Sequence, residues 1–389
     1  MFGTLFFALL ATITGVGIVV PLLPVYASNL GASGLYIGLI FGAFSISRTV
    51  LLPFFGRWSD RRGRKPFIVT GLLAYALVSV AFILFPRVNQ MIAIRFFQGM
   101  ASAMIMPVIQ AYIGDITPQG REGFVMGVFN MSLFFGLSLG PVAGGVISDR
   151  FNLQAAFVCM GLLALIGFGL CLWLLPATHH EEVLRKGRQP LQWRVILSDR
   201  SIVGLFVFRL AYTAGIGIIW GFLPVLAASE FSLTSSQIGV LVMLGVLVSG
   251  LIQAPMGYLA DRISRKAMVV VGGGLAGLSI LCFQWADTYE ILFGASIAFG
   301  FGGGIAMPAV MAVAVLKGNQ TQSMGSVMAL LTVGHSLGML AGAVFAGIMM
   351  DWFDLRMAFR FGGVILFAGI AIFYLSVTGV RIDSNRSGL

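Results

Sequence analysis

Apolar stretches of about 20 residues recur along the whole chain, and only short polar segments separate them. A helix that crosses the hydrocarbon core of a membrane needs about 20 apolar residues. Only 10% of the 389 residues are charged, against roughly 25% in soluble domains, so a water-soluble fold has no means of covering this apolar surface. We therefore expect an all-α integral membrane protein with twelve transmembrane helices. The expected spans are residues 4–27, 35–55, 67–85, 91–113, 123–147, 154–176, 202–228, 236–256, 267–285, 290–316, 323–350 and 356–378.

The longest polar stretch runs from about Ala177 to Asp199 and divides the chain into two parts. It predicts a cytoplasmic linker (177–200) between an N-terminal six-helix bundle (1–176) and a C-terminal six-helix bundle (201–389). The N-terminus enters an apolar run at once and has no basic region, so we expect no removable signal peptide.

The basic residues are distributed unevenly between alternate loops. If the N-terminus is cytoplasmic, the outer loops hold only Arg87, Arg150, Arg356 and Arg360. The positive-inside rule then places both termini in the cytoplasm of a multi-pass inner-membrane protein. The net charge of +10 accordingly reports topology, and we expect no nucleic-acid partner. The inner loops hold Arg57, Arg61, Arg62, Arg64, Lys65, Arg121, Arg185, Lys186, Arg188, Arg194, Arg200, Arg262, Arg265, Lys266, Lys317, Arg381 and Arg386.

The two halves repeat one another at an offset of about 200 residues. GRWSDRRGRK, which begins at Gly56, returns as GYLADRISRK, which begins at Gly257. Two sets of glycines also share their spacing: Gly127, Gly136, Gly140 and Gly144, and Gly325, Gly334, Gly338 and Gly342. Such parallel repeats predict two pseudo-symmetric bundles with a binding site at their interface near the middle of the membrane.

The repeated basic segment has two interpretations. Its charge alone fits a positive-inside anchor. Its recurrence in both halves favours a conformational latch in which an acid and arginines pair with neighbouring helix ends, while glycines allow close approach and a tight turn. The second copy has Ser264 in place of a glycine, which predicts a weaker latch. The latch residues are Gly56, Asp60, Arg61, Gly63, Arg64 and Lys65 in the first copy, and Gly257, Asp261 and Arg262 in the second.

Two motifs carry a family resemblance. The first copy of the basic segment resembles the GxxxDRxGRK segment of the major facilitator superfamily. In that family an acid at the end of the fourth helix engages this segment, and Asp115 occupies the corresponding place. The fifth expected helix resembles the antiporter motif GxxxxxxxxGxxxGPxxGG of the twelve-helix drug:proton antiporter branch, although glycines at this spacing also serve close helix packing. The matching residues are Gly127, Gly136, Gly140, Pro141, Gly144 and Gly145.

This resemblance implies the major facilitator fold and an exporter of small organic molecules or drugs that works by alternating access with proton antiport. It also implies a central cavity lined by the first, second, fourth, fifth, seventh, eighth, tenth and eleventh helices. The expected partners are a small-molecule substrate, protons as the coupling ion and the lipid bilayer, with the protein acting as a monomer. We expect no enzyme activity, cofactor or metal, because the sequence has no HExxH, GxSxG or GxxxxGK[ST] motif.

Charged residues in the interior of the expected spans are all basic. The 14 acidic residues fall in loops or at helix ends, so cations without a buried counter-charge indicate an anionic group on the substrate. Arg95, near a helix end, has snorkelling to the interface as an alternative. His335 is a candidate proton carrier or, equally, a buried neutral histidine. The candidate substrate or coupling residues are Arg48, Arg95, Gln98, Asn130, Arg209, Gln253 and His335.

Two other functions stay open at this point. A uniporter or importer of organic anions fits the arginines. A membrane receptor or scaffold that transports nothing fits the apolar composition, although it gives no reason for a repeated latch in both halves.

Overall fold

The computed structural model describes residues 2–117, 122–176, 198–321 and 324–377. Twelve helices in this part of the chain are long and apolar enough to cross a membrane, which confirms the predicted all-α membrane fold. The helices are α1 (Phe2–Asn29), α2 (Gly34–Arg62), α3 (Arg64–Leu84), α4 (Val88–Ile116), α5 (Glu122–Arg150), α6 (Leu153–Leu174), α8 (Arg200–Phe231), α9 (Ser235–Ala260), α10 (Arg265–Gln284), α11 (Tyr289–Gln320), α12 (Met324–Trp352) and α13 (Leu355–Ser376).

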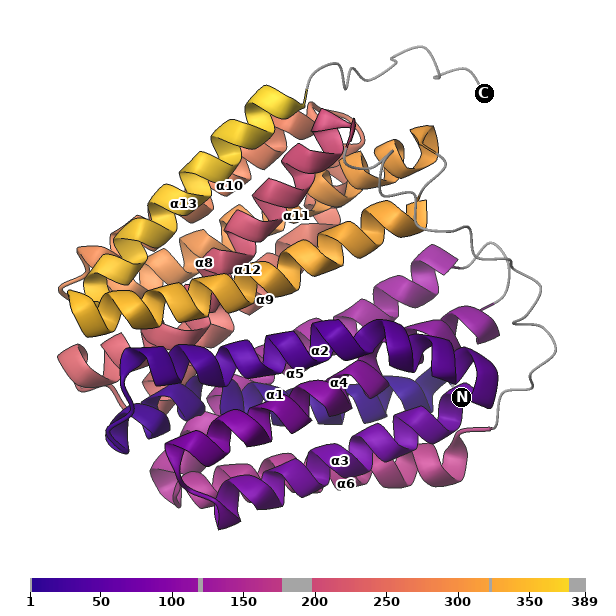
Figure 1. Cartoon of the computed structure of the whole chain (residues 1–389), viewed down its shortest axis with the longest axis vertical. Coiled ribbons are helices and arrows are strands. Elements are labelled where there is room, and N and C mark those ends of the chain that lie inside the picture. Colours follow the sequence, from indigo (N-terminus) through magenta and orange to yellow (C-terminus); the bar gives the residue numbers. More distant parts are fainter. Residues whose placement is uncertain (1, 118–121, 177–197, 322–323, 378–389) are drawn as a thin grey trace.

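Each half pairs its helices in the same way. In the N-terminal half, α1 packs against α5 and α6, α2 against α4, and α3 against α4 and α6. In the C-terminal half, α8 packs against α12 and α13, α9 against α11, and α10 against α11 and α13. The two bundles lie side by side, one indigo to magenta and the other pink to yellow (Figure 1). Helix pairing therefore repeats as the sequence repeat does.

We call the end of the molecule where α1 and α8 begin the linker end, and the opposite end, where α1 and α8 finish, the far end. The linker expected at 177–200 lies mostly outside the described residues, since α8 begins at Arg200 and residues 177–197 are not described. Helix α1 begins and helix α13 finishes at the linker end (Figure 1).

The spaced glycines bring helices together within each half. A Cβ at Gly140 of α5 would lie 2.5 Å from the carbonyl oxygen of Thr14 on α1, closer than a real Cβ approaches. A Cβ at Gly338 of α12, the counterpart of Gly140, would overlap the carbonyl oxygen of Leu210 on α8. Equivalent glycines therefore hold equivalent helix pairs in backbone contact. Gly127 lies within α5, but its surroundings are outside the described residues.

The expected end of the second helix at residue 55 was wrong. Helix α2 continues through Arg62 and α3 begins at Arg64, so Gly63 alone separates them. Gly63 has φ +87°, in the left-handed region that glycine adopts without a steric penalty. Hydropathy marks where a chain leaves the apolar layer, whereas helical hydrogen bonding continues through polar residues beyond it. The latch residues thus lie on two helix ends rather than on a loop.

Candidate functional site

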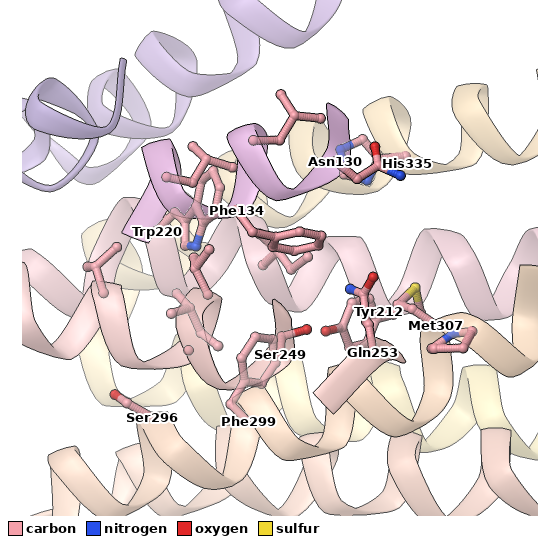
Figure 2. Close-up of a pocket in the computed structure, with 18 of the residues that line it drawn as sticks. Asn130, Phe134, Tyr212, Trp220, Ser249, Gln253, Ser296, Phe299, Met307 and His335 are labelled. Carbon is pink, nitrogen blue, oxygen red and sulfur yellow. The ribbon is translucent and has the colours of Figure 1, made fainter. Parts of the chain in front are cut away.

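A cavity of about 780 Å³ lies between the two halves. The N-terminal half contributes residues of α4 and α5, and the C-terminal half supplies the rest, from α8 through α12. Figure 2 shows Asn130 and Phe134 of α5 across the cavity from Ser249, Gln253 and Tyr212. The lining residues are Gln110, Asn130, Leu133, Phe134, Leu137, Arg209, Tyr212, Ile216, Ile219, Trp220, Leu241, Val242, Gly245, Val246, Ser249, Gln253, Phe283, Ser296, Phe299, Met307, Pro308, Met311 and His335.

The helices that line the cavity differ from the set that the family resemblance implied. Neither α1 nor α2 contributes a lining residue, and α10 contributes Phe283. The reason is packing: α2 lies along α12, while α1 lies along α5 and α8. Their inward faces are therefore covered by neighbouring helices.

One wall of the cavity is a stack of aromatic rings. The ring of Tyr212 lies parallel to that of Phe299, with centroids 5.7 Å apart and an interplanar angle of 3°. The ring of Tyr212 also stacks with that of Phe208, which does not line the cavity, with centroids 6.2 Å apart and an interplanar angle of 15°. Trp220 and Phe134 add further aromatic surface. Such a wall favours the binding of flat aromatic or apolar ligand groups.

The polar centre of the cavity is formed by Arg209 and His335. Arg209 Nη2 lies 3.3 Å from His335 Nδ1, and Arg209 Nη1 donates to the thioether of Met307 at 2.6 Å. Arginine carries only hydrogen-bond donors, so this contact requires His335 to accept at Nδ1 and to carry its proton on Nε2. Arg209 Nε is buried and has no hydrogen-bond partner among the described residues.

Arg95 and Gln98 lie away from this cavity. Arg95 is 4% exposed and donates from Nη1 to Gln98 Oε1 at 2.7 Å and from Nε to the Ile40 carbonyl at 3.2 Å. Its guanidinium also lies 4.5 Å from the ring centroid of Phe44. Its partners therefore belong to the packed contact between α2 and α4, and its side chain does not snorkel to the interface.

The other candidate residues fall into two groups. Asn130, Arg209, Gln253 and His335 line the cavity. Arg48 is half-buried in the middle of α2, outside the lining, and it has no hydrogen-bond or ion-pair partner among the described residues.

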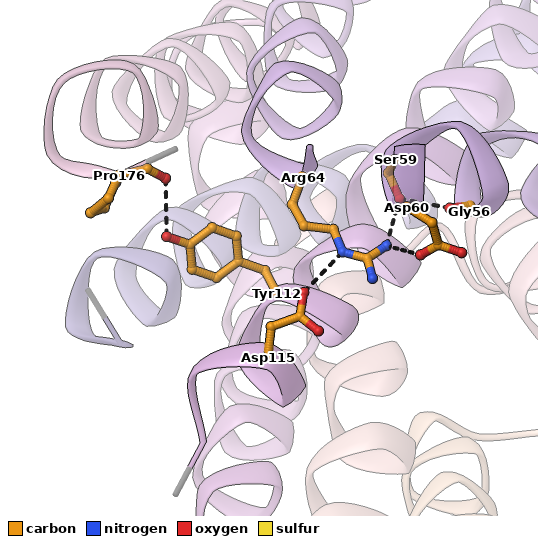
Figure 3. A network of polar contacts seen from close by, with 7 residues as sticks. All are labelled: Gly56, Ser59, Asp60, Arg64, Tyr112, Asp115 and Pro176. Carbon is orange, nitrogen blue, oxygen red and sulfur yellow. Dashed lines mark hydrogen bonds and ion pairs between the residues drawn. The ribbon is translucent and has the colours of Figure 1, made fainter. Parts of the chain in front are cut away.

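Arg64 joins three helix ends in the N-terminal half (Figure 3). It is 6% exposed, and it forms ion pairs with Asp60 at 2.5 Å and with Asp115 of α4 at 3.1 Å. Its Nη1 also donates to Ser59 Oγ at 2.8 Å. The predicted acid on α4 thus contacts the segment, whereas Arg61 is exposed and Lys65 half-buried.

The second copy is built differently. Arg265 pairs only with Asp261 among the described residues, at 3.5 Å, and that carboxylate is 74% exposed. Arg262 lies over the ring of Tyr258. Leu316 stands where the repeat would place the counterpart of Asp115, so α11 has no acid there to complete the network.

The neighbouring Lys317 of α11 instead binds Asp199, which caps the start of α8, at 3.0 Å. Partial burial acts to raise the pKa of Asp199, but hydrogen bonds from Lys317 and from the Ser201 backbone outweigh it and lower that pKa. The Asp199 carboxylate is therefore charged at neutral pH and ties α8 to α11 at the linker end.

Two seams of small residues close the far end. Along α2 and α12, a Cβ at Gly38 would overlap the Ala343 carbonyl oxygen. Along α5 and α9, a Cβ at Gly239 would overlap the Pro141 carbonyl oxygen. The halves are thus in backbone contact there, and no larger side chain fits between them without displacement.

A carboxylate caps a helix of the other half at each seam. Asp351 of α12 accepts from the backbone N–H of Gly34 and of Leu35, at 2.6 and 2.8 Å. Asp149 of α5 accepts from the N–H of Ser235 and of Ser236, at 3.0 and 2.8 Å. Unsatisfied N–H groups and the helix dipole favour a negative charge at a helix N-terminus. We call these two contacts the far-end clasps.

At the linker end, the first glycine of each repeated basic segment makes no backbone contact of this kind. Nothing lies within 4 Å of a Cβ placed at Gly56 or at Gly257, so neither residue makes the expected close approach in this conformation. The helices of the two halves diverge toward the linker end (Figure 1). The molecule is therefore closed between its halves at the far end and splayed at the linker end.

The sequence model of the Major Facilitator Superfamily matches residues 5–216 and again residues 205–387. The chain belongs to the Major Facilitator Superfamily. The two matches correspond to the two bundles. As a member of this family, the protein is a membrane transporter and not an enzyme.

Relatives in the Major Facilitator Superfamily match over almost the whole chain. An uncharacterized MFS-type transporter of Methanocaldococcus jannaschii is 28% identical and covers 94% of this chain and 95% of its own length. Multidrug resistance protein 2 of Bacillus subtilis is 27% identical and covers 95% of this chain and 94% of its own.

Solved structures share the fold at low sequence identity. A bacterial homologue of the human lysosomal transporter Spinster, in an inward-facing and unoccupied conformation, has a TM-score of 0.82 at 14% identity and covers 96% of both chains. The human organic anion transporter MFSD10 has a TM-score of 0.68 at 19% identity and covers 96% of this chain and 98% of its own.

Sequence reasoning missed the aromatic wall and the far-end clasps. Tyr212, Trp220 and Phe299 lie in apolar helices where residues facing a cavity, a lipid or another helix look alike. The clasps did have a signal: Asp149 and Asp351 each stand near the end of equivalent helices, about 200 residues apart. Together with the internal repeat, that spacing indicates that the two acids make equivalent contacts in the two halves.

Removing the far-end clasps is expected to weaken closure of the far end. Asp149→Ala and Asp351→Ala each delete a helix cap, which costs about 1 kcal/mol. The double variant should therefore shift the balance between closed and open far ends roughly tenfold or more, as measured by spin-label distances across that end. The control is Asp287→Ala, an exposed acid of the same end whose ion-pair partner among the described residues, Arg356, belongs to its own half. Equal effects of the control and the double variant would contradict the role of the clasps.

Proposed function

We propose that the protein exports small organic molecules by alternating access, with the interface cavity as its binding site. The supporting observation is the combination of a cavity between the halves with far-end seams in which glycines bring backbones together and carboxylates cap helices of the other half. Rocking of the halves then exposes the same cavity to either end.

The linker end is proposed to face the cytoplasm. The basic residues of the repeated segments lie there, at the α2–α3 and α9–α10 junctions, and Lys317 lies at the same end. The positive-inside rule favours this orientation in the inner membrane. The conformation described is accordingly open to the cytoplasm, as needed to load a substrate for export. One chain carries the complete cavity, which fits a monomer.

Proton antiport is the proposed driving reaction. Its support is the antiporter glycine motif and the similarity to relatives named multidrug resistance proteins. None of the described cavity-lining residues is a carboxylate, so His335 is the candidate proton site. The Nδ1 lone pair of His335 accepts from Arg209 Nη2, and protonation of Nδ1 must break that contact because arginine cannot accept a hydrogen bond.

A second candidate is a uniporter or importer of organic anions, which the arginine-only charge of the cavity favours. One neighbour of the same fold is titled an organic anion transporter. A uniporter of anions would respond to the membrane potential, which is worth about 2.3 kcal/mol per charge for each 100 mV, and would ignore a pH gradient.

Flux in proteoliposomes separates these functions. Purified protein is reconstituted with a pH-sensitive dye inside, and uptake of tetraphenylphosphonium or 2-naphthalenesulfonate is followed under an imposed pH gradient or an imposed potassium potential. Antiport predicts substrate flux that follows the pH gradient, with protons moving the opposite way. Flux that follows the potential alone supports the uniporter. No flux of any tested solute under either gradient would contradict transport of these compounds and favour a receptor or scaffold.

A further inference from the structure

Arg209 is a buried charge whose binding capacity is only partly used. Its guanidinium has five N–H donors, and the described contacts are a thioether, which is a weak acceptor, and the neutral Nδ1 of His335. Its Nε has no partner. A buried cation without a counter-charge costs several kcal/mol unless something pairs with it. Among the described residues, no carboxylate lines the cavity to do so.

The free edge of Arg209 has a defined shape. Nε and Nη2 form the side-on edge of the guanidinium, which binds two oxygens of a carboxylate, sulfonate or phosphate through parallel hydrogen bonds. Nη2 is engaged only by a 3.3 Å contact with the ring of His335, which a charged oxygen readily replaces. Arg48 of α2, in the other half, is a second partly buried cation without a hydrogen-bond or ion-pair partner among the described residues.

The rest of the cavity suits an apolar body. The stacked pair of Tyr212 and Phe299 lines the same cavity as Arg209, and Phe134 lies across the cavity on the other half (Figure 2). The volume of about 780 Å³ lies within the range of about 300–1,000 Å³ for pockets that hold drug-sized ligands. A ligand with an anionic group at Arg209 and an aromatic body in this cavity would thus contact both halves of the protein at once.

We propose that the substrate class is an aromatic organic anion, whose anionic group binds the Nε and Nη2 edge of Arg209 and whose ring lies against Tyr212 and Phe299. This inference rests on the proposed transport function and names the chemistry of its cargo. Export of an anion is also favoured by the inside-negative potential of a cell, so charge and proposed direction agree.

The test is binding of four matched compounds to the purified full chain, measured by titration calorimetry against detergent blanks. They are 2-naphthalenesulfonate, the cation 2-naphthyltrimethylammonium, neutral 2-naphthol and aliphatic hexanesulfonate. The wild-type protein should bind the naphthalenesulfonate most tightly. Tighter binding of the cation or of 2-naphthol overturns the proposal, and tighter binding of hexanesulfonate overturns its aromatic part.

Variants test where the anionic group and the aromatic ring of the ligand bind. Arg209→Gln should weaken 2-naphthalenesulfonate binding about 10- to 100-fold, the effect of losing hydrogen bonds to a charged group, and leave 2-naphthol nearly unchanged. Arg209→Lys keeps the charge but loses the side-on edge, so it should fall in between. Phe299→Leu should weaken the naphthalenesulfonate more than hexanesulfonate. Arg360→Gln, an exposed arginine of α13, is the control and should bind as the wild type does.

Folding is checked for each variant by its thermal transition. If Arg209→Gln is unfolded, Arg209→Lys and Phe299→Leu still decide the matter, and unchanged naphthalenesulfonate binding in both would overturn the proposal. Binding is measured without any gradient, so its outcome is separate from that of transport. Flux of another solute without anion binding would sink this inference alone, whereas anion binding without flux would sink the proposed function alone.

Discussion

Replacing Gly38 with leucine is expected to hold the two halves apart at the far end and to abolish transport. The position of a Cβ at Gly38 is already occupied by the carbonyl oxygen of Ala343 on α12. Backbone atoms of a packed helix have no room to retreat, so overpacking costs about 1–3 kcal/mol or more. That cost falls only on the conformation in which the far end is closed. A penalty of about 3 kcal/mol changes the ratio of the two conformations by more than 100-fold.

The measurement is access to the cavity from the far side. A cysteine at Ser249, which lines the cavity, is introduced into protein whose native Cys159, Cys171 and Cys282 have been replaced. A membrane-impermeant thiol reagent added on the far side should label it faster when Gly38→Leu is present, and substrate flux should be lost.

Gly294→Leu is the matched control for this experiment. Gly294 lies near the far end of α11, and nothing lies within 4 Å of a Cβ placed there. This substitution should leave labelling and flux unchanged. Unaltered labelling in Gly38→Leu would show that the seam between α2 and α12 does not close the far end.

The second large effect is expected from Arg64→Ala. Arg64 is buried between Asp60 and Asp115, so its loss leaves two carboxylates facing one another without their shared cation. Breaking a buried ion pair from one side costs about 3–5 kcal/mol, and we expect the lower end of this range because the carboxylates are 22% and 31% exposed. The thermal transition of the purified protein should fall by several degrees.

The internal repeat provides the control for Arg64. Arg265 is its counterpart, but its only described partner, Asp261, is largely exposed, and exposed ion pairs contribute about 1 kcal/mol or less. Arg265→Ala should therefore cause a clearly smaller decrease. Equal losses of stability in the two variants would contradict the assignment of Arg64 as the centre of a buried network.

The helices and the repeat could be predicted from the sequence because a membrane-spanning helix must be continuously apolar. Helix ends could not: the polar residues from Gly56 to Arg62 prolong α2 beyond its apolar part. Arg209 and His335 stood out as polar groups in apolar helices. Arg95 stood out equally, but its side chain contacts Gln98 and Phe44 in the packed interface of α2 and α4. The sequence does not reveal these contacts. The contact of Asp351 with Gly34 joins residues 317 positions apart, beyond any local pattern.

Spin-label distances at both ends of the molecule test the central claim most directly. One pair replaces Phe151 and Trp352 at the far end, and a second pair replaces Trp58 and Ile263 at the linker end; all four side chains are exposed. During transport, the account predicts a second population in which the far-end distance is longer and the linker-end distance shorter. Distances that stay fixed at both ends during measured flux, or that lengthen together, would contradict rocking of two halves about a shared cavity.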